Sequence, residues 1–354
     1  MYPRLEIDIQ KIRHNAKLLV DKCKKENIQI AAVTKVYCAF PEIVEAIKDT
    51  GIKYIADSRI QNLKKLKHIN LPKILLRIPM MSEVEELVRY VDISLNSEID
   101  VIRKIDQEAK KINKVQKIAL MVDLGDLREG YFNEEELFDC IEQVLKLENI
   151  KLVGVGTNLT CYGAIIPSKE NTQKLVDIAK KIEKRYKIDI DFISAGNSSS
   201  LHLIDKNQMP QGVSNLRLGE AIALGRETAY GDKIEGAYQD AFKLICEIVE
   251  LKEKPSVPIG EIGMDAFGNK PVYEDRGIRK RAIIGIGKQD INISAITPID
   301  TKIDILGASS DHLILDVTES DINYKVGDKV EFNLEYGALM SAATSEYVYK
   351  VFKG

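Results

Sequence analysis

Short runs of β-branched residues alternate with helix-like stretches along the first two thirds of this 354-residue chain, and this alternation restricts the fold most strongly. Helical periodicity is clear over residues 98–111, 134–147 and 170–186. Strands that are separated by helices pair in parallel, because each crossover returns the chain in the same direction. We predict eight such strands, at residues 30–35, 54–56, 74–77, 91–95, 118–123, 152–158, 189–194 and 215–218.

Eight strands within about 190 residues favour a compact TIM-type (β/α)8 barrel over an open sheet. An open, doubly wound sheet is the alternative, although no Gly-x-Gly-x-x-Gly loop follows the first strand. After Gly231 glycine, proline and turn dipeptides separate short strands, and helical periodicity nearly disappears. We therefore predict a barrel over residues 1–231 and a smaller, all-β C-terminal domain over residues 232–354. Residues 5–9 alternate like a strand and are a possible part of the β domain.

Composition excludes several classes of partner. The 51 basic and 54 acidic residues leave a formal net charge of −3, so no global field attracts nucleic acid or an anionic membrane. No apolar run reaches the roughly 18 residues that a membrane span needs, and residues 1–6 are too polar for a signal peptide. The five scattered cysteines form no CxxC pair, which indicates reduced thiols without zinc. We expect a cytoplasmic protein with no metal site.

Lys35 follows the apolar run 28–34 and precedes the helix-like stretch 41–49. Active sites of barrel enzymes lie at the C-terminal ends of the strands. We expect this lysine to be buried, and a buried amine that is neutral can attack a carbonyl carbon or take up a proton. Lys35 is therefore a candidate Schiff-base lysine, and a solvated strand end is the plainer interpretation.

Three further segments stand at predicted strand ends. Residues 123–130 (DLGDLREG) form an acidic, glycine-rich loop that contains Arg128. Residues 194–200 (SAGNSSS) place small residues and hydroxyls at the start of a helix, where backbone N–H groups favour a phosphate. Residues 215–221 (NLRLGEA) again put glycine after a strand. Each segment alone is equally consistent with a turn, a helix cap or a strand terminus.

Together and in this order, the four segments resemble the alanine racemase family of pyridoxal-phosphate enzymes of fold type III. The family's lysine, D-x-G-x-x-R-x-G loop, N-S segment and R-x-G segment match Lys35, residues 123–130, residues 197–198 and residues 217–219. Weaker similarity at residues 307–311, 316–318 and 327–328 extends the resemblance over nearly the whole chain. Residues 34–40 and 309–312 resemble the branch of the family that acts on ornithine.

The resemblance implies a barrel plus a β domain, pyridoxal 5'-phosphate bound through Lys35, and a homodimer with shared active sites. Arg217 matches the arginine at the pyridine nitrogen, and Arg128 matches the position that can bind the substrate carboxylate. The remaining cofactor-binding residues that the resemblance implies are Ser198, Gly219 and Glu220 at the phosphate, with Tyr37, Asn197, Ser199 and Tyr349 or Tyr347 as helpers.

Two positions depart from the family pattern. The family's second catalytic base is a tyrosine in a G-Y-x-D-G segment, whereas the matching residues here are Gly287–Lys288–Gln289–Asp290. Asn158 stands where the family has a histidine after the sixth strand. The second base is thus left open among Lys288, Tyr273, Tyr37 and Cys38.

The function that the resemblance implies is the interconversion of L- and D-ornithine, with lysine, alanine or serine as alternative substrates. A decarboxylase of basic amino acids is disfavoured by Arg217, because that family pairs the ring nitrogen with an acid. A non-catalytic pyridoxal-phosphate carrier is disfavoured by the β domain. A buried substrate ammonium needs an acceptor, and Asp290, Asp311 and Glu220 are candidates.

Overall fold

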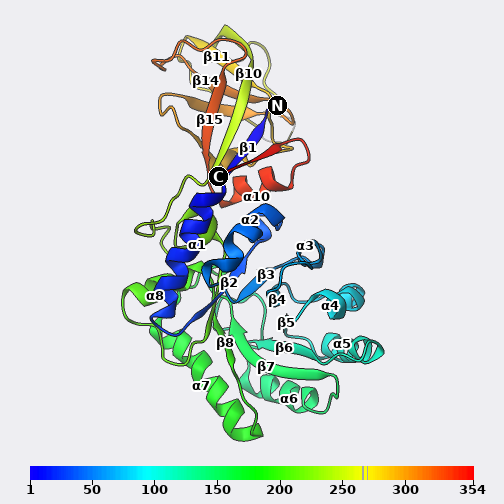
Figure 1. Ribbon diagram of the computed structural model, residues 1–354. Coiled ribbons are helices and arrows are strands. Elements are labelled where there is room, and N and C mark those ends of the chain that lie inside the picture. The colour runs from blue at the N-terminus through cyan, green and yellow to red at the C-terminus, as the bar shows by residue number, and fades with distance from the viewer. Residues whose placement is uncertain (265–266, 269) are drawn as a thin grey trace. The chain divides into compact units, whose positions relative to one another are not determined.

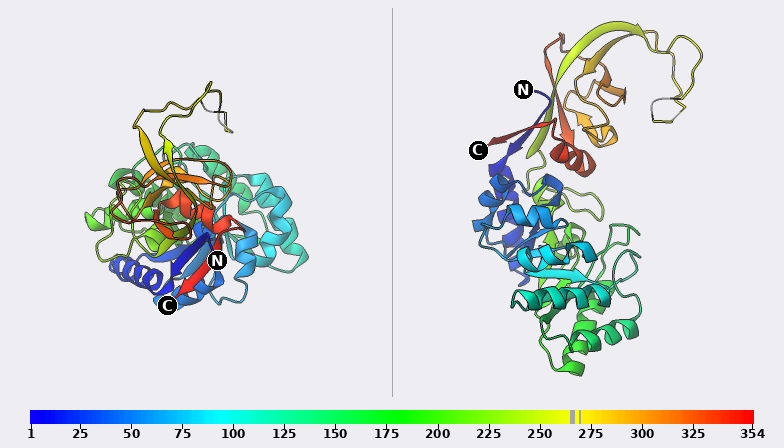
Figure 2. Two further views of the ribbon diagram at one scale, coloured as in Figure 1. Left: turned by 90° about the horizontal axis from the view of Figure 1, so that it is seen from above. Right: turned by 90° about the vertical axis from the view of Figure 1, so that its right-hand side faces the viewer.

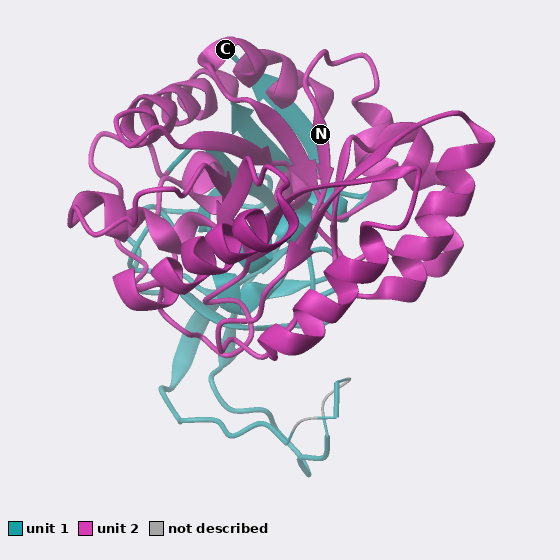
Figure 3. Ribbon diagram, turned by 90° about the horizontal axis from the view of Figure 1, so that it is seen from below, with its two compact units in different colours: residues 1–8, 240–354 teal, residues 9–239 magenta. Residues whose placement is uncertain are grey.

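The computed structural model describes residues 1–264, 267–268 and 270–354, which form two compact units. One unit comprises residues 9–239, and the other comprises residues 1–8 together with residues 240–354 (Figure 3). The chain thus passes between the units after Gln239, whereas the sequence predicted the change after Gly231. Within the described residues, no helix is long and apolar enough to cross a membrane.

Residues 9–239 fold as a closed barrel of eight parallel strands with helices around it (Figure 1). The barrel closes where Ala32 of the first strand pairs with Leu218 of the last. This finding confirms the predicted (β/α)8 class. The strands are β2 (Gln29–Val33), β3 (Tyr54–Asp57), β4 (Lys73–Leu75), β5 (Ile93–Asn96), β6 (Gln116–Met121), β7 (Ile150–Thr157), β8 (Phe192–Ala195) and β9 (Asn215–Leu218).

The longest helix of this unit begins at a residue whose side chain caps it. The longest, α7 (Lys169–Tyr186), starts with a capping box in which Ser168 and Asn171 satisfy each other's backbone N–H groups, and its buried apolar residues recur at helical spacing. The others are α1 (Ile9–Lys24), α2 (Pro41–Ile47), α3 (Ile60–Lys65), α4 (Val84–Tyr90), α5 (Ile99–Lys111), α6 (Glu134–Val144), α8 (Leu201–Asp205) and α9 (Glu220–Leu224), with 3-10 turns η1 (Lys35–Tyr37), η2 (Lys48–Thr50), η3 (Met81–Glu83) and η4 (Ser198–Ser200).

The barrel interior is packed with apolar side chains from alternate strand positions. Small residues such as Ala31, Ala56 and Ala119 face larger ones such as Met121 and Phe192. Interdigitation of small and large residues fills a barrel of this size, so the interior is a core and not a channel. The polar groups that can do chemistry are therefore restricted to the ends of the strands.

Residues 1–8 and 240–354 form an eight-stranded sheet. Its long, curved strand β10 pairs with three others, β1, β11 and β15 (Figure 2). The opening strand joins this sheet, as the alternation in residues 5–9 indicated. The strands are β1 (Arg4–Asp8), β10 (Phe242–Pro255), β11 (Ile278–Ile284), β12 (Ile296–Pro298), β13 (Asp304–Ala308), β14 (Leu313–Asp316), β15 (Lys329–Leu334) and β16 (Tyr349–Lys353).

The second unit also contains helical structure that the loss of periodicity did not indicate. The helix α10 (Tyr336–Thr344) follows β15 directly, and the 3-10 turn η5 (Ile293–Ala295) precedes β12. Four alanine or leucine residues of α10 are buried, but its remaining positions are also small or apolar, so no polar face marks it as amphipathic. The domain is thus predominantly, but not entirely, β-structure.

Candidate active site

Lys35 lies directly past the C-terminal end of β2, as expected. Thr34 precedes it, and the Thr34 hydroxyl donates a 2.6 Å hydrogen bond to Asp57 Oδ2 at the end of β3. The Thr34 backbone N–H also donates to the carbonyl of Ala56, at 2.9 Å. These bonds fix the backbone from which the lysine projects. The expectation that Lys35 is buried is wrong for this chain, since the residue is exposed.

The segment after Lys35 has an unusual backbone. Cys38 and Ala39 both have a φ of 51°, in the left-handed region that residues with a side chain seldom adopt. Tyr37 is fully buried, and burial, reinforced by the charge of Asp57, raises the pKa of its hydroxyl. Tyr37 is therefore a neutral, buried side chain, while Cys38 is half-buried.

The loop after β6 is folded back on itself by its acidic and glycine residues. Asp123 Oδ1 accepts hydrogen bonds from the backbone of Gly125 at 2.9 Å and of Leu127 at 3.1 Å. Gly130 has a φ of 121°, and a Cβ there would lie 2.8 Å from the backbone nitrogen of Asp123. Only glycine fits this close approach. Arg128, in the same loop, is exposed.

The Arg128 guanidinium forms a bidentate ion pair with the carboxylate of Glu129. Burial disfavours its charge, but the hydrogen bond and the negative charge of Glu129 outweigh burial and raise the pKa of Arg128. The side chain is still 42% exposed, so its outer edge is accessible. A fixed guanidinium of this kind suits recognition of a carboxylate.

Arg217, on β9, is buried beneath the same end of the barrel. Its guanidinium donates to Ser194 Oγ at 2.5 Å and to the Thr157 carbonyl at 2.6 Å. All the hydrogen bonds that the structure records for this side chain end on neutral oxygens. Burial lowers the pKa of Arg217 to about 10. At neutral pH the residue therefore keeps its positive charge.

The segments after β8 and β9 lie side by side. Asn197 caps η4 by accepting from the backbone of Ser199 at 2.9 Å, and Ser198 Oγ accepts from the backbone of Ala221 at 3.2 Å. A Cβ on Gly219 would lie 3.2 Å from Val33 Cβ, so the residue after β9 passes close to the end of β2, which Lys35 follows. The hydroxyl of Ser199 is buried and has no hydrogen-bond partner among the described residues.

Asn158 connects these elements at the end of β7. Its side-chain amide lies 3.1 Å from Asn197 Nδ2 and 3.0 Å from a guanidinium nitrogen of Arg128. Either orientation of the amide offers its oxygen to one of the two donors. The Arg217 guanidinium lies 3.5 Å from the same amide. The two arginines and Asn197 thus converge on Asn158, which the sequence singled out only as a departure from the family.

Cys161 and Asp126 belong to the same part of the barrel and were not singled out by the sequence. Cys161 is exposed, and its Sγ lies 3.6 Å from Asn197 Nδ2. Asp126 is 1% exposed and accepts from the backbone of Tyr162 at 2.9 Å. The useful signal was positional, because the mostly polar run 158–162 directly follows a barrel strand.

The other sequence-predicted residues lie in the β domain. Lys288 and Tyr273 line one cavity of about 590 Å³, in which the Lys288 ammonium stands 3.8 Å from the centre of the Phe267 ring. Tyr273 and Tyr349 are each 44% exposed. Asp290 is buried and accepts a 2.7 Å hydrogen bond from Ser345, so this carboxylate already has a partner.

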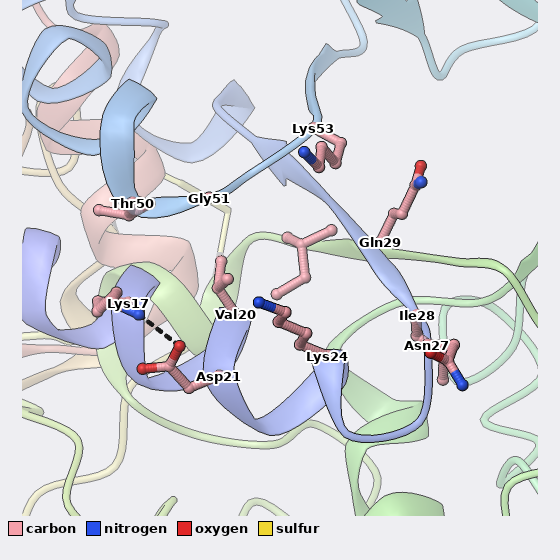
Figure 4. A pocket seen from close by; sticks show the side chains of 11 residues that line it. Lys17, Val20, Asp21, Lys24, Asn27, Ile28, Gln29, Thr50, Gly51 and Lys53 are labelled. Atoms are coloured by element: carbon pink, nitrogen blue, oxygen red, sulfur yellow. Dashed lines mark hydrogen bonds and ion pairs between the residues drawn. The ribbon is translucent and has the colours of Figure 1, made fainter.

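A further cavity, of about 320 Å³, lies at the opposite end of the barrel (Figure 4). Lys17, Asp21 and Lys24 of α1 face Gln29 and Lys53 there, and Lys17 is paired with Asp21. The N-terminal face of such a barrel serves stability more often than catalysis. Within the described ranges, no cluster of three His, Cys, Asp or Glu side chains could hold a metal ion.

The fold and the site together define a (β/α)8-barrel protein with a strand-end lysine and two converging arginines. Residues 7–226 match the N-terminal domain of alanine racemase. The chain is 55% identical to the ornithine racemase of Acetoanaerobium sticklandii, covering 99% of both chains. It is 40% identical to the lysine racemase of Thermotoga maritima, covering 100% of this chain and 99% of that one. The chain therefore belongs to the alanine racemase family.

Solved structures agree on the fold. The alanine racemase of Bartonella henselae, which carries covalently bound pyridoxal phosphate, superimposes with a TM-score of 0.74 at 18% identity and covers 100% of both chains. The D-threonine aldolase of Filomicrobium marinum has a TM-score of 0.75 at 12% identity, covering 99% of this chain and 92% of that one. At these identities the likeness shows the architecture alone.

Proposed function

We propose that this protein is a pyridoxal-phosphate-dependent racemase that interconverts L- and D-ornithine. The observation that carries the substrate assignment is the 55% identity with an ornithine racemase over 99% of both chains. The site supports the chemistry, because an exposed lysine stands at the end of β2, while β9, which pairs with β2, carries Arg217 and is followed directly by Gly219.

The residues present fit pyridoxal phosphate. Ser198, Gly219 and Glu220 stand at the starts of η4 and α9, where backbone N–H groups and a hydroxyl can hold a phosphate. The buried Ser199 hydroxyl without a partner in the described structure is a further donor. When bound, pyridoxal phosphate withdraws electrons from the α-carbon of an amino acid and so makes the α-hydrogen acidic.

Each basic residue then has a role in this proposal. Lys35 Nζ would hold the cofactor covalently and move a proton to or from the α-carbon. Arg128 would bind the substrate carboxylate, for which its guanidinium is suited. Arg217 would donate a hydrogen bond to the pyridine nitrogen without releasing its proton, because the pKa of about 10 keeps it charged. A ring nitrogen that gains no proton favours return of hydrogen to the α-carbon over transamination.

The experiment is a racemisation screen of the purified protein with added pyridoxal phosphate. Each enantiomer of ornithine, lysine, alanine and serine is supplied separately, and the opposite enantiomer is measured by chiral chromatography. We expect the highest kcat/KM with ornithine. A higher kcat/KM with lysine would favour the second candidate, a lysine racemase, which the 40% identical relative supports. Turnover of none of these amino acids would refute the proposal.

We further propose a cytoplasmic homodimer in which both subunits contribute to each site. The five free cysteines support a reducing compartment, and the family resemblance supports the dimer. In that assembly Lys288, Tyr273 and Tyr349 of the β domain would be contributed to the site. Sedimentation equilibrium tests the dimer directly, and a monomer at micromolar concentration would refute it.

A further inference from the structure

Racemisation requires proton transfer at both faces of the α-carbon. Lys35 projects from the end of β2 and serves one face in the proposed function, on which this inference rests. The second group should come from a different strand end, so that it approaches from another direction. In the barrel, β7 is separated from β2 by β8 and β9 on one side and by four strands on the other. The segment after β7 therefore satisfies this requirement.

Cys161 lies in that segment and contacts Asn197, one of the proposed cofactor-binding residues. Its Sγ is 3.6 Å from Asn197 Nδ2, within hydrogen-bonding range for sulfur. Asn197 in turn caps the turn that carries Ser198 and Ser199. The thiol is thus placed at the site by a side-chain contact and not by sequence proximity, since 36 residues separate the two.

Two positively charged groups act on Cys161. The guanidinium groups of Arg128 and Arg217 are both close enough to interact electrostatically with its sulfur. Glu129 acts on both arginines, and Asp126 acts on Arg128. Glu129 is already paired with Arg128, and Asp126 is bound by backbone N–H groups. The thiolate is the form of cysteine that accepts a proton.

The other four cysteines do not share this environment. Cys23, Cys140 and Cys246 are buried, and burial raises the pKa of each thiol, that of Cys23 to about 12. Cys38 is half-buried. Of the five cysteines, all of which are described, Cys161 alone is exposed.

The loop that carries Cys161 is anchored to the loop that carries Arg128. Asp126 accepts from the backbone of Cys161 at 3.4 Å, of Tyr162 at 2.9 Å and of Ile165 at 3.2 Å. Its own carbonyl accepts from Gly163 at 3.1 Å. These bonds fix the position of the loop that carries Cys161 relative to the loop that carries Arg128.

Two buried hydroxyls in the segments that contain Cys161 and Asn197 indicate a ligand at this end of the barrel. Thr157 is 1% exposed and Ser199 is fully buried, and neither hydroxyl has a hydrogen-bond partner within the described residues. Thr157 ends the strand that leads to Cys161, and Ser199 follows the asparagine that contacts it. Because buried polar groups are normally paired, two unpaired hydroxyls at the ends of the neighbouring strands β7 and β8 indicate that a polar molecule binds there.

We propose that Cys161 is the second proton-transfer residue of the racemase. In one direction the Cys161 thiolate takes the α-hydrogen as a proton and becomes a thiol, and the electron pair of the C–H bond stays with the substrate and cofactor. The Lys35 ammonium then donates a proton to the opposite face and becomes an amine. The reverse direction exchanges the two roles, and exchange with solvent restores the starting protonation states.

The first measurement does not depend on turnover. The holoenzyme is treated with limiting iodoacetamide, and the alkylation of each cysteine is followed by mass spectrometry with and without ornithine. We expect Cys161 to react first and ornithine to slow its alkylation, while Cys23 and Cys246 stay unmodified. Preferential alkylation of Cys38, or alkylation of Cys161 that ornithine does not affect, would overturn the assignment.

The second measurement compares Cys161→Ser with Tyr162→Phe, an exposed neighbour in the same loop that serves as the matched control. Exchange of the α-hydrogen for solvent deuterium is followed by NMR from each enantiomer, after the cofactor absorbance has shown equal loading. For Cys161→Ser we expect exchange from one enantiomer to fall about 10²–10⁴-fold, and far less from the other, because Lys35 still serves that face. With Tyr162→Phe, the α-hydrogen of both enantiomers should exchange at the wild-type rate.

The outcomes separate this inference from the proposed function. Suppose that the wild type exchanges α-hydrogen, but that Cys161→Ser slows exchange from neither enantiomer more than from the other. In that case the role of Cys161 is wrong and the racemase assignment stands. If instead Lys288→Ala or Tyr273→Phe shows the one-sided loss, the second base belongs to the β domain and Cys161 is rejected. If the wild type exchanges no amino acid, both proposals fail.

Discussion

Replacing Asp126 tests how the site is held together. The carboxylate is 1% exposed and accepts from three backbone N–H groups of the loop after β7. A hydrogen bond to a charged group contributes about 1.5–3 kcal/mol. The 3.4 Å contact is marginal, and the released N–H groups of this exposed loop can bind water. We therefore expect Asp126→Ala to lower the free energy of opening this loop by about 2–4 kcal/mol.

The appropriate assay is amide hydrogen exchange of residues 159–166, because it reports local opening and not global unfolding. At about 1.4 kcal/mol for each factor of ten, protection of these amides should fall roughly 30-fold to 700-fold in Asp126→Ala. Asp126→Asn keeps one acceptor oxygen, so the protection of these amides should lie between that of the alanine variant and that of the wild type. Asp100→Ala, at an aspartate whose side chain is 72% exposed, is the control.

A change in protection of less than about threefold in Asp126→Ala, near 0.6 kcal/mol, would refute this reasoning. An equal loss in the asparagine and alanine variants would show that the charge of the carboxylate, and not the number of its acceptors, holds the loop. In either case the anchoring of Cys161 to the Arg128 loop would have to be reconsidered.

Three further predictions concern the ends of β2, β3 and β9. Lys35→Ala should abolish both racemisation and the covalent attachment of pyridoxal phosphate, and a cofactor that borohydride fixes to another lysine would contradict this role. Arg217→Glu should slow racemisation and raise the fraction of transaminated product, measured as pyridoxamine phosphate, and unchanged partitioning would reject the role of Arg217. Burial raises the pKa of Asp57 above its ordinary value of 3.8, despite the hydrogen bond from Thr34. The folded state therefore binds the carboxyl proton of Asp57 more tightly than the unfolded state does. The stability that protonated Asp57 contributes is fully present below pH 3.8 and is lost as pH rises through the pKa of the folded state. Asp57→Asn should remove that decline in unfolding free energy, and an unchanged pH profile in urea titrations would contradict it.

Much of the fold could be read from local sequence patterns. The strand 215–218 was predicted at the bounds that the structure has, and the other barrel strands within a few residues. A buried parallel strand is a short β-branched run between helices, so its signal lies within the segment itself. The helix α10 was missed because small and apolar residues on all sides leave no periodic pattern. Strand β12 has only three residues, too few for alternation to register.

The sequence by itself determined the barrel class, the strand-end position of Lys35 and the order of the motifs that contain Arg128, Asn197 and Arg217. These properties depend on residues that are close in the chain. Only the tertiary structure decided that Lys35 is exposed while Tyr37 is fully buried. Likewise, only the side-by-side pairing of β6 to β9 brings Cys161 to Asn197 and both arginines to Asn158. Exposure and contact depend on which segments pack together, and no local pattern encodes the neighbour that a side chain meets across parallel strands.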